Sequence, residues 1–163
     1  MNNQSLALSF EVYDSIEELP EDDATLLRAA QLATRNSYAP YSSFHVGAAA
    51  KLSNGAVITG TNQENASYPV GMCAERVLLS AVSAVHPDTA IDSIAISYQN
   101  DHGSSNKPIA PCGICRQTLS EYESRFKKPI RLILGGMQGR VFVIPQASIL
   151  LPLQFSADDM ETG

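Results

Sequence analysis

Two short stretches of the sequence hold side chains that can bind a metal ion and move a proton. In "CAERVLLSAV", Cys73 and Glu75 lie two residues apart, and in "PCGIC", Cys112 and Cys115 lie three residues apart. Both stretches begin helical patterns, and residues three apart share a helix face, so the thiols gather near helix starts. Thiolates are common zinc ligands. The spacing therefore indicates a zinc site, and a Cys-x-x-Cys redox pair is the weaker interpretation.

The number of cysteines bears on the kind of zinc site. Structural zinc sites are closed by four protein ligands, whereas catalytic sites keep one position for water. The chain has three cysteines and three histidines, and among the histidines only His102, in a polar loop, could serve as a fourth ligand. Three thiolates favour a catalytic site. A site closed by His102 would instead make the chain a non-catalytic, zinc-stabilised interaction module.

Two charged side chains follow the first cysteine and fit a catalytic site. Glu75 cannot easily bind the same ion in tetrahedral geometry, but it can reach a water molecule at the open position. It could take the proton of that water and deliver it to a leaving group. Arg76 could offset the negative charge of three thiolates on a divalent ion. The alternatives are a glutamate that complements the helix dipole and an arginine in a surface ion pair.

Composition and charge exclude several classes of protein. With 163 residues, 44% of them hydrophobic, the chain is expected to form one compact domain. The net charge of −6 argues against nucleic-acid binding, which needs a basic surface. No apolar stretch reaches the roughly 18–20 residues that cross a bilayer, and the N-terminus lacks the pattern of a signal peptide. An odd number of cysteines argues against a disulfide framework, so we expect a cytoplasmic protein.

The elements that would position the thiols follow an α/β pattern. The order α-β-β-α-β-α-β-β-α predicts a mixed sheet covered by helices. An Asn-Gly turn is expected to join two of the strands. The expected helices cover about 23–37, 73–85, 112–126 and a short C-terminal segment around 145–152, and the strands cover 44–52, 56–62, 91–98, 130–136 and 140–145. Residues 7–13, "ALSFEVY", alternate like an added edge strand.

Cys-Ala-Glu followed by Pro-Cys-x-x-Cys resembles the signature of zinc-dependent cytidine deaminases. Further blocks look like the same family: "YAPYSSFHVGAA" (38–49), "GTNQENASYP" (60–69), "CAERVLL", "PCGICRQ" and "LLPLQFS" (150–156). A cysteine at position 73 resembles the small homotetrameric, three-cysteine branch. The resemblance implies a three-layer α/β fold with a mixed five-stranded sheet and helices on both faces. It covers a catalytic domain at 23–163, preceded by an N-terminal extension, 1–22, of unknown role.

The resemblance also implies the reaction. It is the hydrolytic deamination of cytidine and deoxycytidine to uridine and deoxyuridine, with release of ammonia, in pyrimidine salvage. One Zn²⁺ per subunit would activate water, and Glu75 would shuttle protons. The family's contacts to the pyrimidine base match Phe44 and the Ala74 amide, and its contacts to the ribose hydroxyls match Asn62 and Glu64. Phe155 matches a phenylalanine that would reach a neighbouring subunit's site in a homotetramer.

Other substrates stay open at this point. Deaminases of modified cytosine nucleosides such as blasticidin S share Cys-Ala-Glu, although Asn62 and Glu64 favour a ribose nucleoside. Editing of a polynucleotide would need a basic channel, which the acidic composition argues against. Phe44 and Phe155 could also be core residues. The loop 99–110 looks longer than is usual in the family and is expected to border the pocket, where it would influence substrate preference.

Overall fold

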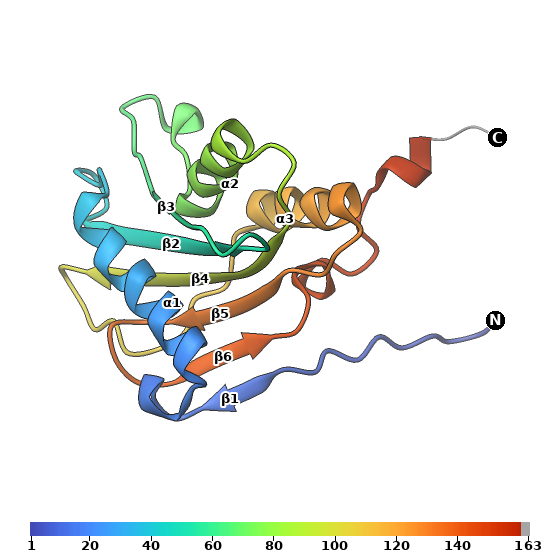
Figure 1. Cartoon of the computed structure of the whole chain (residues 1–163), viewed down its shortest axis with the longest axis horizontal. Helices are drawn as coiled ribbons and strands as arrows, with labels where there is room; N and C mark the ends of the chain where they lie inside the picture. Colours follow the sequence, from blue (N-terminus) through green and yellow to red (C-terminus); the bar gives the residue numbers. More distant parts are fainter. Residues whose placement is uncertain (161–163) are drawn as a thin grey trace.

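A six-stranded mixed sheet runs through the computed structural model, which describes residues 1–160 (Figure 1). The strands are β1 (Glu11–Tyr13), β2 (Phe44–Leu52), β3 (Val57–Thr61), β4 (Ile91–Asn100), β5 (Arg131–Gly135) and β6 (Val141–Ile144), in the spatial order β1-β6-β5-β4-β2-β3. Only β4 and β5 run parallel. The last residues of the expected domain, 161–163, lie outside the described part of the chain.

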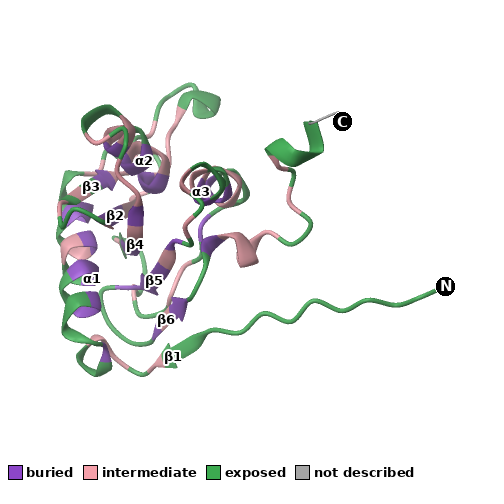
Figure 2. Ribbon diagram, turned by 45° about the vertical axis from the view of Figure 1, so that its right-hand side comes forward, coloured by how far each residue is buried: buried purple, intermediate pink, exposed green. Residues whose placement is uncertain are grey.

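Helices cover both faces of the sheet, as expected. They are α1 (Glu21–Ala33), α2 (Ala74–Val85) and α3 (Gly113–Phe126). On one face α1 buries Leu27 and Ala30 against small and branched residues of the sheet, including Ala49. On the other face α2 and α3 bury Leu78 and Leu119. Buried residues accordingly concentrate where the helices meet the sheet (Figure 2).

The sheet has one strand more than the five expected from the family resemblance. The sixth strand is β1, which pairs antiparallel with β6 through Val12 and Phe142. It lies within the stretch 7–13 whose alternation indicated an edge strand. The count of five was wrong because it described the family domain alone, without a strand from the N-terminal extension.

Several element boundaries also differ from the expected ones. Helix α1 begins at Glu21, directly after Pro20, so the expected domain boundary at 22/23 falls inside its first turn. After Ala33 the chain continues as a 3-10 turn to Asn36. The C-terminal helix expected around 145–152 is a four-residue 3-10 turn, Ala147–Leu150. Further 3-10 turns cover Ile16–Glu18, Tyr68–Val70 and Ala157–Met160.

The hairpin of β2 and β3 holds α2 in place. The expected Asn-Gly turn joins these strands, and Gly55 adopts a φ of 86°, which favours glycine. Gly60 on β3 lets the strand approach the backbone of α2: a Cβ there would lie 2.4 Å from the Leu78 amide nitrogen. This contact fixes the height of α2 over the sheet, and with it the start of the helix. No helix in residues 1–160 is long and apolar enough to cross a membrane.

Candidate metal centre

Cys73 meets Cys112 and Cys115, which lie far from it in the sequence, between the starts of α2 and α3. Cys73 is the N-cap residue of α2, Cys112 is the N-cap residue of α3, and Cys115 lies in the first turn of α3. The Sγ atoms of Cys73 and Cys112 are 3.6 Å apart, and those of Cys112 and Cys115 are 3.4 Å apart. Two thiolates on a tetrahedral zinc ion lie about 3.8 Å apart, since each Zn–S bond is about 2.3 Å long. The three side chains therefore fit a zinc ion with only small adjustments.

The surroundings of the thiols favour deprotonation of Cys73. Hydrogen bonds from Cys115 and Cys112, together with the charge of Arg76, lower the pKa of Cys73 to about 6. The same hydrogen bond and burial raise the pKa of Cys115. The first amides of α2 and α3 have no acceptor within their helices and add partial positive charge. Zinc binding, which requires thiolates, therefore starts from a cluster in which one thiol already ionises near neutral pH.

Arg76 lies in the first turn of α2, close enough to Cys73 for its charge to lower the pKa of that thiol. It forms no salt bridge with an acidic side chain in the part of the chain that the structure describes. The alternative of an ordinary surface ion pair therefore finds no support. Its effect on the pKa of Cys73 fits the expected role in balancing thiolate charge.

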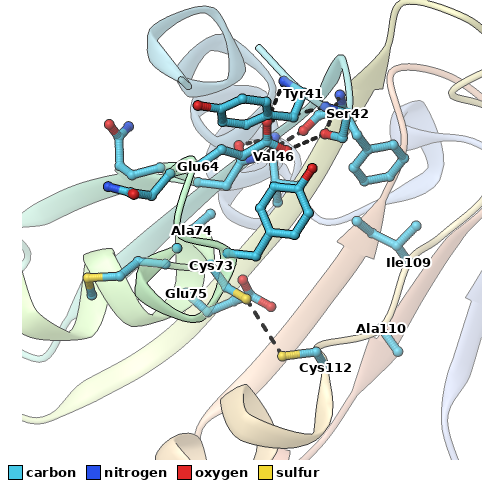
Figure 3. Close-up of a pocket in the computed structure, with 17 residues that line it drawn as sticks. Tyr41, Ser42, Val46, Glu64, Cys73, Ala74, Glu75, Ile109, Ala110 and Cys112 are labelled. Carbon is cyan, nitrogen blue, oxygen red and sulfur yellow. Dashed lines mark hydrogen bonds between the residues drawn. The ribbon is translucent and has the colours of Figure 1, made fainter. Parts of the chain in front are cut away.

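Glu75 lies beside the thiols with its side chain directed into a cavity (Figure 3). Only 5% of the residue is exposed. Burial raises the pKa of its carboxyl group, because the charged form loses hydration. A carboxyl group in such surroundings can hold a proton closer to neutral pH than an exposed glutamate can. This property suits a group that takes a proton and then returns it.

The cavity has a volume of about 710 Å³. Its floor is formed by Cys73, Cys112 and Glu75, and its walls come from β2, from the segment after β3 and from the loop before α3. The expected substrate contacts Phe44, Asn62, Glu64 and Ala74 all line it. Phe155 does not line the cavity of its own chain: it is 60% exposed, and its carbonyl accepts a hydrogen bond from the Gln117 side chain at 2.9 Å.

The aromatic and amide side chains of the cavity wall are held by the sheet. Phe44 stacks on buried Tyr98, with ring centroids 4.8 Å apart. Asn62 donates from Nδ2 to the Phe44 carbonyl at 2.9 Å and accepts from the Val46 amide at 2.8 Å. The amide of Asn62 therefore fixes the end of β3 to β2, and each of its polar atoms keeps capacity for one further hydrogen bond.

Glu64 is clamped by a tight turn at the other end of the cavity (Figure 3). Its Oε2 accepts hydrogen bonds from the amides of Tyr41, at 2.9 Å, and Ser42, at 3.3 Å, and its Oε1 accepts one from the Ser42 hydroxyl. The bond from the Ser42 hydroxyl is the main cause that lowers the pKa of Glu64. The carboxylate is thus held ionised and oriented along the cavity rim.

Several residues of the cavity wall were not among the site residues expected from the sequence. Tyr41 and Tyr68 both line the cavity and form an edge-to-face pair, with ring centroids 5.8 Å apart. Both lie inside family-like blocks, which was the available signal. Ile109 comes from the loop 99–110, which does border the cavity as expected. His102 lies exposed in that loop and is not part of the metal-ligand cluster among the described residues.

Comparison with known proteins agrees with this arrangement. Residues 20–129 match the family model of the cytidine and deoxycytidylate deaminase zinc-binding region. A cytidine deaminase of Halalkalibacterium halodurans is 38% identical over 85% of this chain and 98% of the relative. A blasticidin-S deaminase of Bacillus cereus is 31% identical over 69% of this chain and 77% of the relative. The crystal structure of cytidine deaminase from Burkholderia pseudomallei superimposes with a TM-score of 0.70 at 38% identity, over 84% of this chain and 100% of the other.

Proposed function

This chain belongs to the cytidine and deoxycytidylate deaminase family, and from that premise we propose that it converts cytidine and deoxycytidine to uridine and deoxyuridine. The observation that carries the proposal is a cluster of three thiols, two of which line one cavity together with a buried carboxyl group. A zinc ion on these thiols would supply a water molecule of lowered pKa for attack on C4 of the ring.

The side chains of the cavity supply the remaining chemistry. Glu75 takes one proton from the attacking water and delivers it to N3 of the ring; it then takes the second proton, from the hydroxyl added at C4, and delivers it to the departing amine. Phe44, held by its stack on Tyr98, packs on the pyrimidine. The Ala74 amide, in the first turn of α2 where it has no acceptor within the helix, donates to the base. At the far end of the cavity Glu64 accepts hydrogen bonds from the ribose hydroxyls, and Asn62 can accept through Oδ1 or donate through Nδ2.

The charges along the cavity favour a free nucleoside over a nucleotide. The charged side chains in its lining are two carboxylates, Glu64 and Glu75, and the described lining contains no lysine or arginine. A phosphate group is usually bound by such cations or by backbone amides. A phosphate on the ribose would therefore meet the carboxylate of Glu64 without a compensating positive charge.

A modified cytosine nucleoside, such as blasticidin S, is the second candidate substrate. The similarity to a blasticidin-S deaminase supports it. Glu64, oriented along the rim by Ser42, supports the ribose instead. Turnover of cytidine and of blasticidin S, measured side by side with purified protein, separates the two. A higher kcat/KM for blasticidin S would make the antibiotic the substrate.

The remaining family features are also proposals for this chain. A homotetramer with shared active sites is supported by Phe155, which is exposed and lies outside the cavity of its own chain. Three cysteines without a disulfide support a reducing, cytoplasmic setting, where the reaction would serve pyrimidine salvage.

Glu75→Gln tests the proposed function. It keeps the shape of the side chain and removes the acid, so kcat for cytidine should fall by about 10²- to 10⁴-fold. Zinc content by elemental analysis and the circular dichroism spectrum should stay unchanged. Glu121→Gln, an exposed position on α3, is the matched control and should keep full turnover. Unchanged ammonia release in Glu75→Gln would remove this residue from the mechanism.

A further inference from the structure

The N-terminal residues prolong the edge strand β1 beyond the sheet. Residues 1–10, here called the arm, are exposed and run away from the body of the molecule as one extended segment (Figures 1 and 2). β1 itself pairs with β6 on one side and forms the outer edge of the sheet on the other. An open edge presents backbone N–H and C=O groups to any further strand.

The arm and β1 share an apolar stripe. Leu6, Leu8, Phe10 and Val12 are exposed by 72%, 49%, 39% and 52%. They alternate with small or polar residues, so an extended chain places all four on one face. The stripe begins on the chain's own sheet, where the ring of Phe10 lies 4.9 Å from that of Phe142, and continues past it. A single strand with such a face is not stable alone in water, and pairing with a further strand would stabilise it.

We propose that the arm pairs antiparallel with the arm of a second copy of this chain, about a two-fold axis at Ser9. In this register Leu6 lies opposite Val12 of the partner subunit, and Leu8 lies opposite Phe10 of the partner subunit. All four apolar side chains then meet one another. A shift by two residues in either direction places Val12 opposite Gln4 or Leu6 opposite Asp14, so this register is the most complementary one.

The charges of the arm favour a second copy over other occupants. Residues 1–10 contain no charged side chain, so two arms meet without repulsion, and Glu11 lies opposite Ala7 of the partner subunit. The amino terminus of each arm runs toward the acidic stretch of the other copy that holds Glu17 and Glu18. An anionic lipid surface is disfavoured because the arm has no lysine or arginine and acidic residues follow it.

The arm is separate from the proposed active site. The cavity lies at the β2–β3 side of the sheet, whereas β1 is the opposite edge strand. The family match begins after the arm, at residue 20. Substitutions in the arm should therefore leave cytidine turnover unchanged, which separates a failure of this proposal from a failure of the proposed function.

A cysteine scan of the arm tests the register. Directly opposed residues of an antiparallel pair have Cα atoms about 4.5–5.5 Å apart, within the range that a disulfide spans. Ser9→Cys should therefore form a covalent dimer under mild oxidation, seen on non-reducing gels. Ser5→Cys should not, because the two substituted residues would lie about 26 Å apart. Unsubstituted protein controls for the native thiols. Absence of the Ser9→Cys dimer, or equal cross-linking of both variants, overturns the proposal.

A matched pair of charge substitutions tests the apolar stripe. Leu8→Lys places a charge on the stripe, whereas Ala7→Lys places the same charge on the other face, opposite Glu11 of the partner subunit. In a dilution series followed by light scattering, Leu8→Lys and a deletion of residues 1–10 should raise the midpoint concentration for dissociation by at least about tenfold. Ala7→Lys should not raise it. Equal midpoints for all four proteins would show that the arm binds no second copy.

Discussion

At the scale of single residues, the hydroxyl of Ser42 should control the charge of Glu64. Because its hydrogen bond is the main cause that lowers the pKa of Glu64, this carboxylate stays ionised at lower pH than an ordinary glutamate. In Ser42→Ala the pKa should rise toward its usual range. As pH falls from 7 to 5, Glu64 should then become protonated and the KM for cytidine should increase. The pH at which KM begins to increase should be higher in Ser42→Ala than in the unsubstituted protein. Steady-state kinetics across this range checks the shift, and an identical pH profile of KM for both proteins would contradict it.

Arg76 offers a second prediction at this scale. Its charge helps to lower the pKa of Cys73, so Arg76→Gln should raise that pKa and weaken the hold on zinc. Protons compete with zinc for the thiolate, so a thiol of higher pKa loses its metal at higher pH. Zinc transfer to a chelator should become faster between pH 7 and 6. Arg125→Gln, at the last turn of α3, is the control and should transfer zinc at the original rate.

At the scale of elements, the contact between β3 and α2 decides where Cys73 and Glu75 lie. A Cβ on Gly60 would meet backbone atoms of α2, namely the Leu78 amide and the Ala74 carbonyl, at 2.4 and 2.7 Å. Gly60→Ala must therefore displace the helix, at a cost of about 1–3 kcal/mol in the free energy of unfolding. Turnover should fall with it, because Cys73 and Glu75 move with the helix. Gly113→Ala, with open space at its Cβ, should keep the stability or raise it in denaturant titrations.

The same elements show which features the sequence could predict. Local signals sufficed for the β2–β3 hairpin, through its Asn-Gly turn, and for the thiols, because each marks the start of a helix. The alternation of residues 7–13 indicated the sixth strand, but not its partner: the pairing of Val12 with Phe142, 130 positions away, is not visible in local periodicity. The cavity wall combines Tyr41, Tyr68 and Ile109 from three separate segments. Asn62 also ties β3 to β2 through hydrogen bonds to the backbone of Phe44 and Val46. The sequence does not predict this role, because it depends on tertiary geometry.

At the scale of the whole molecule, one chain does not bring all of the expected substrate contacts together. Four of them line its cavity, but Phe155 lies outside, on a segment that Arg116 and Gln117 of α3 hold through the carbonyls of Leu150 and Phe155. The helix whose start holds two of the three clustered cysteines therefore also anchors the segment with the exposed phenylalanine. In a symmetric assembly this segment can complete the site of another subunit.

Mixing two inactive variants tests whether sites are shared. Phe155→Ala keeps Glu75, and Glu75→Gln keeps Phe155, so each alone should have low turnover. If the phenylalanine acts in a neighbouring subunit, unfolding and refolding the two variants together should restore about a quarter of the sites, because random association then combines an intact carboxylate with an intact ring. Leu153→Ala, in the same exposed segment, is the control and should be active alone. If mixing restores no activity beyond the sum of the two variants, the phenylalanine does not act across subunits.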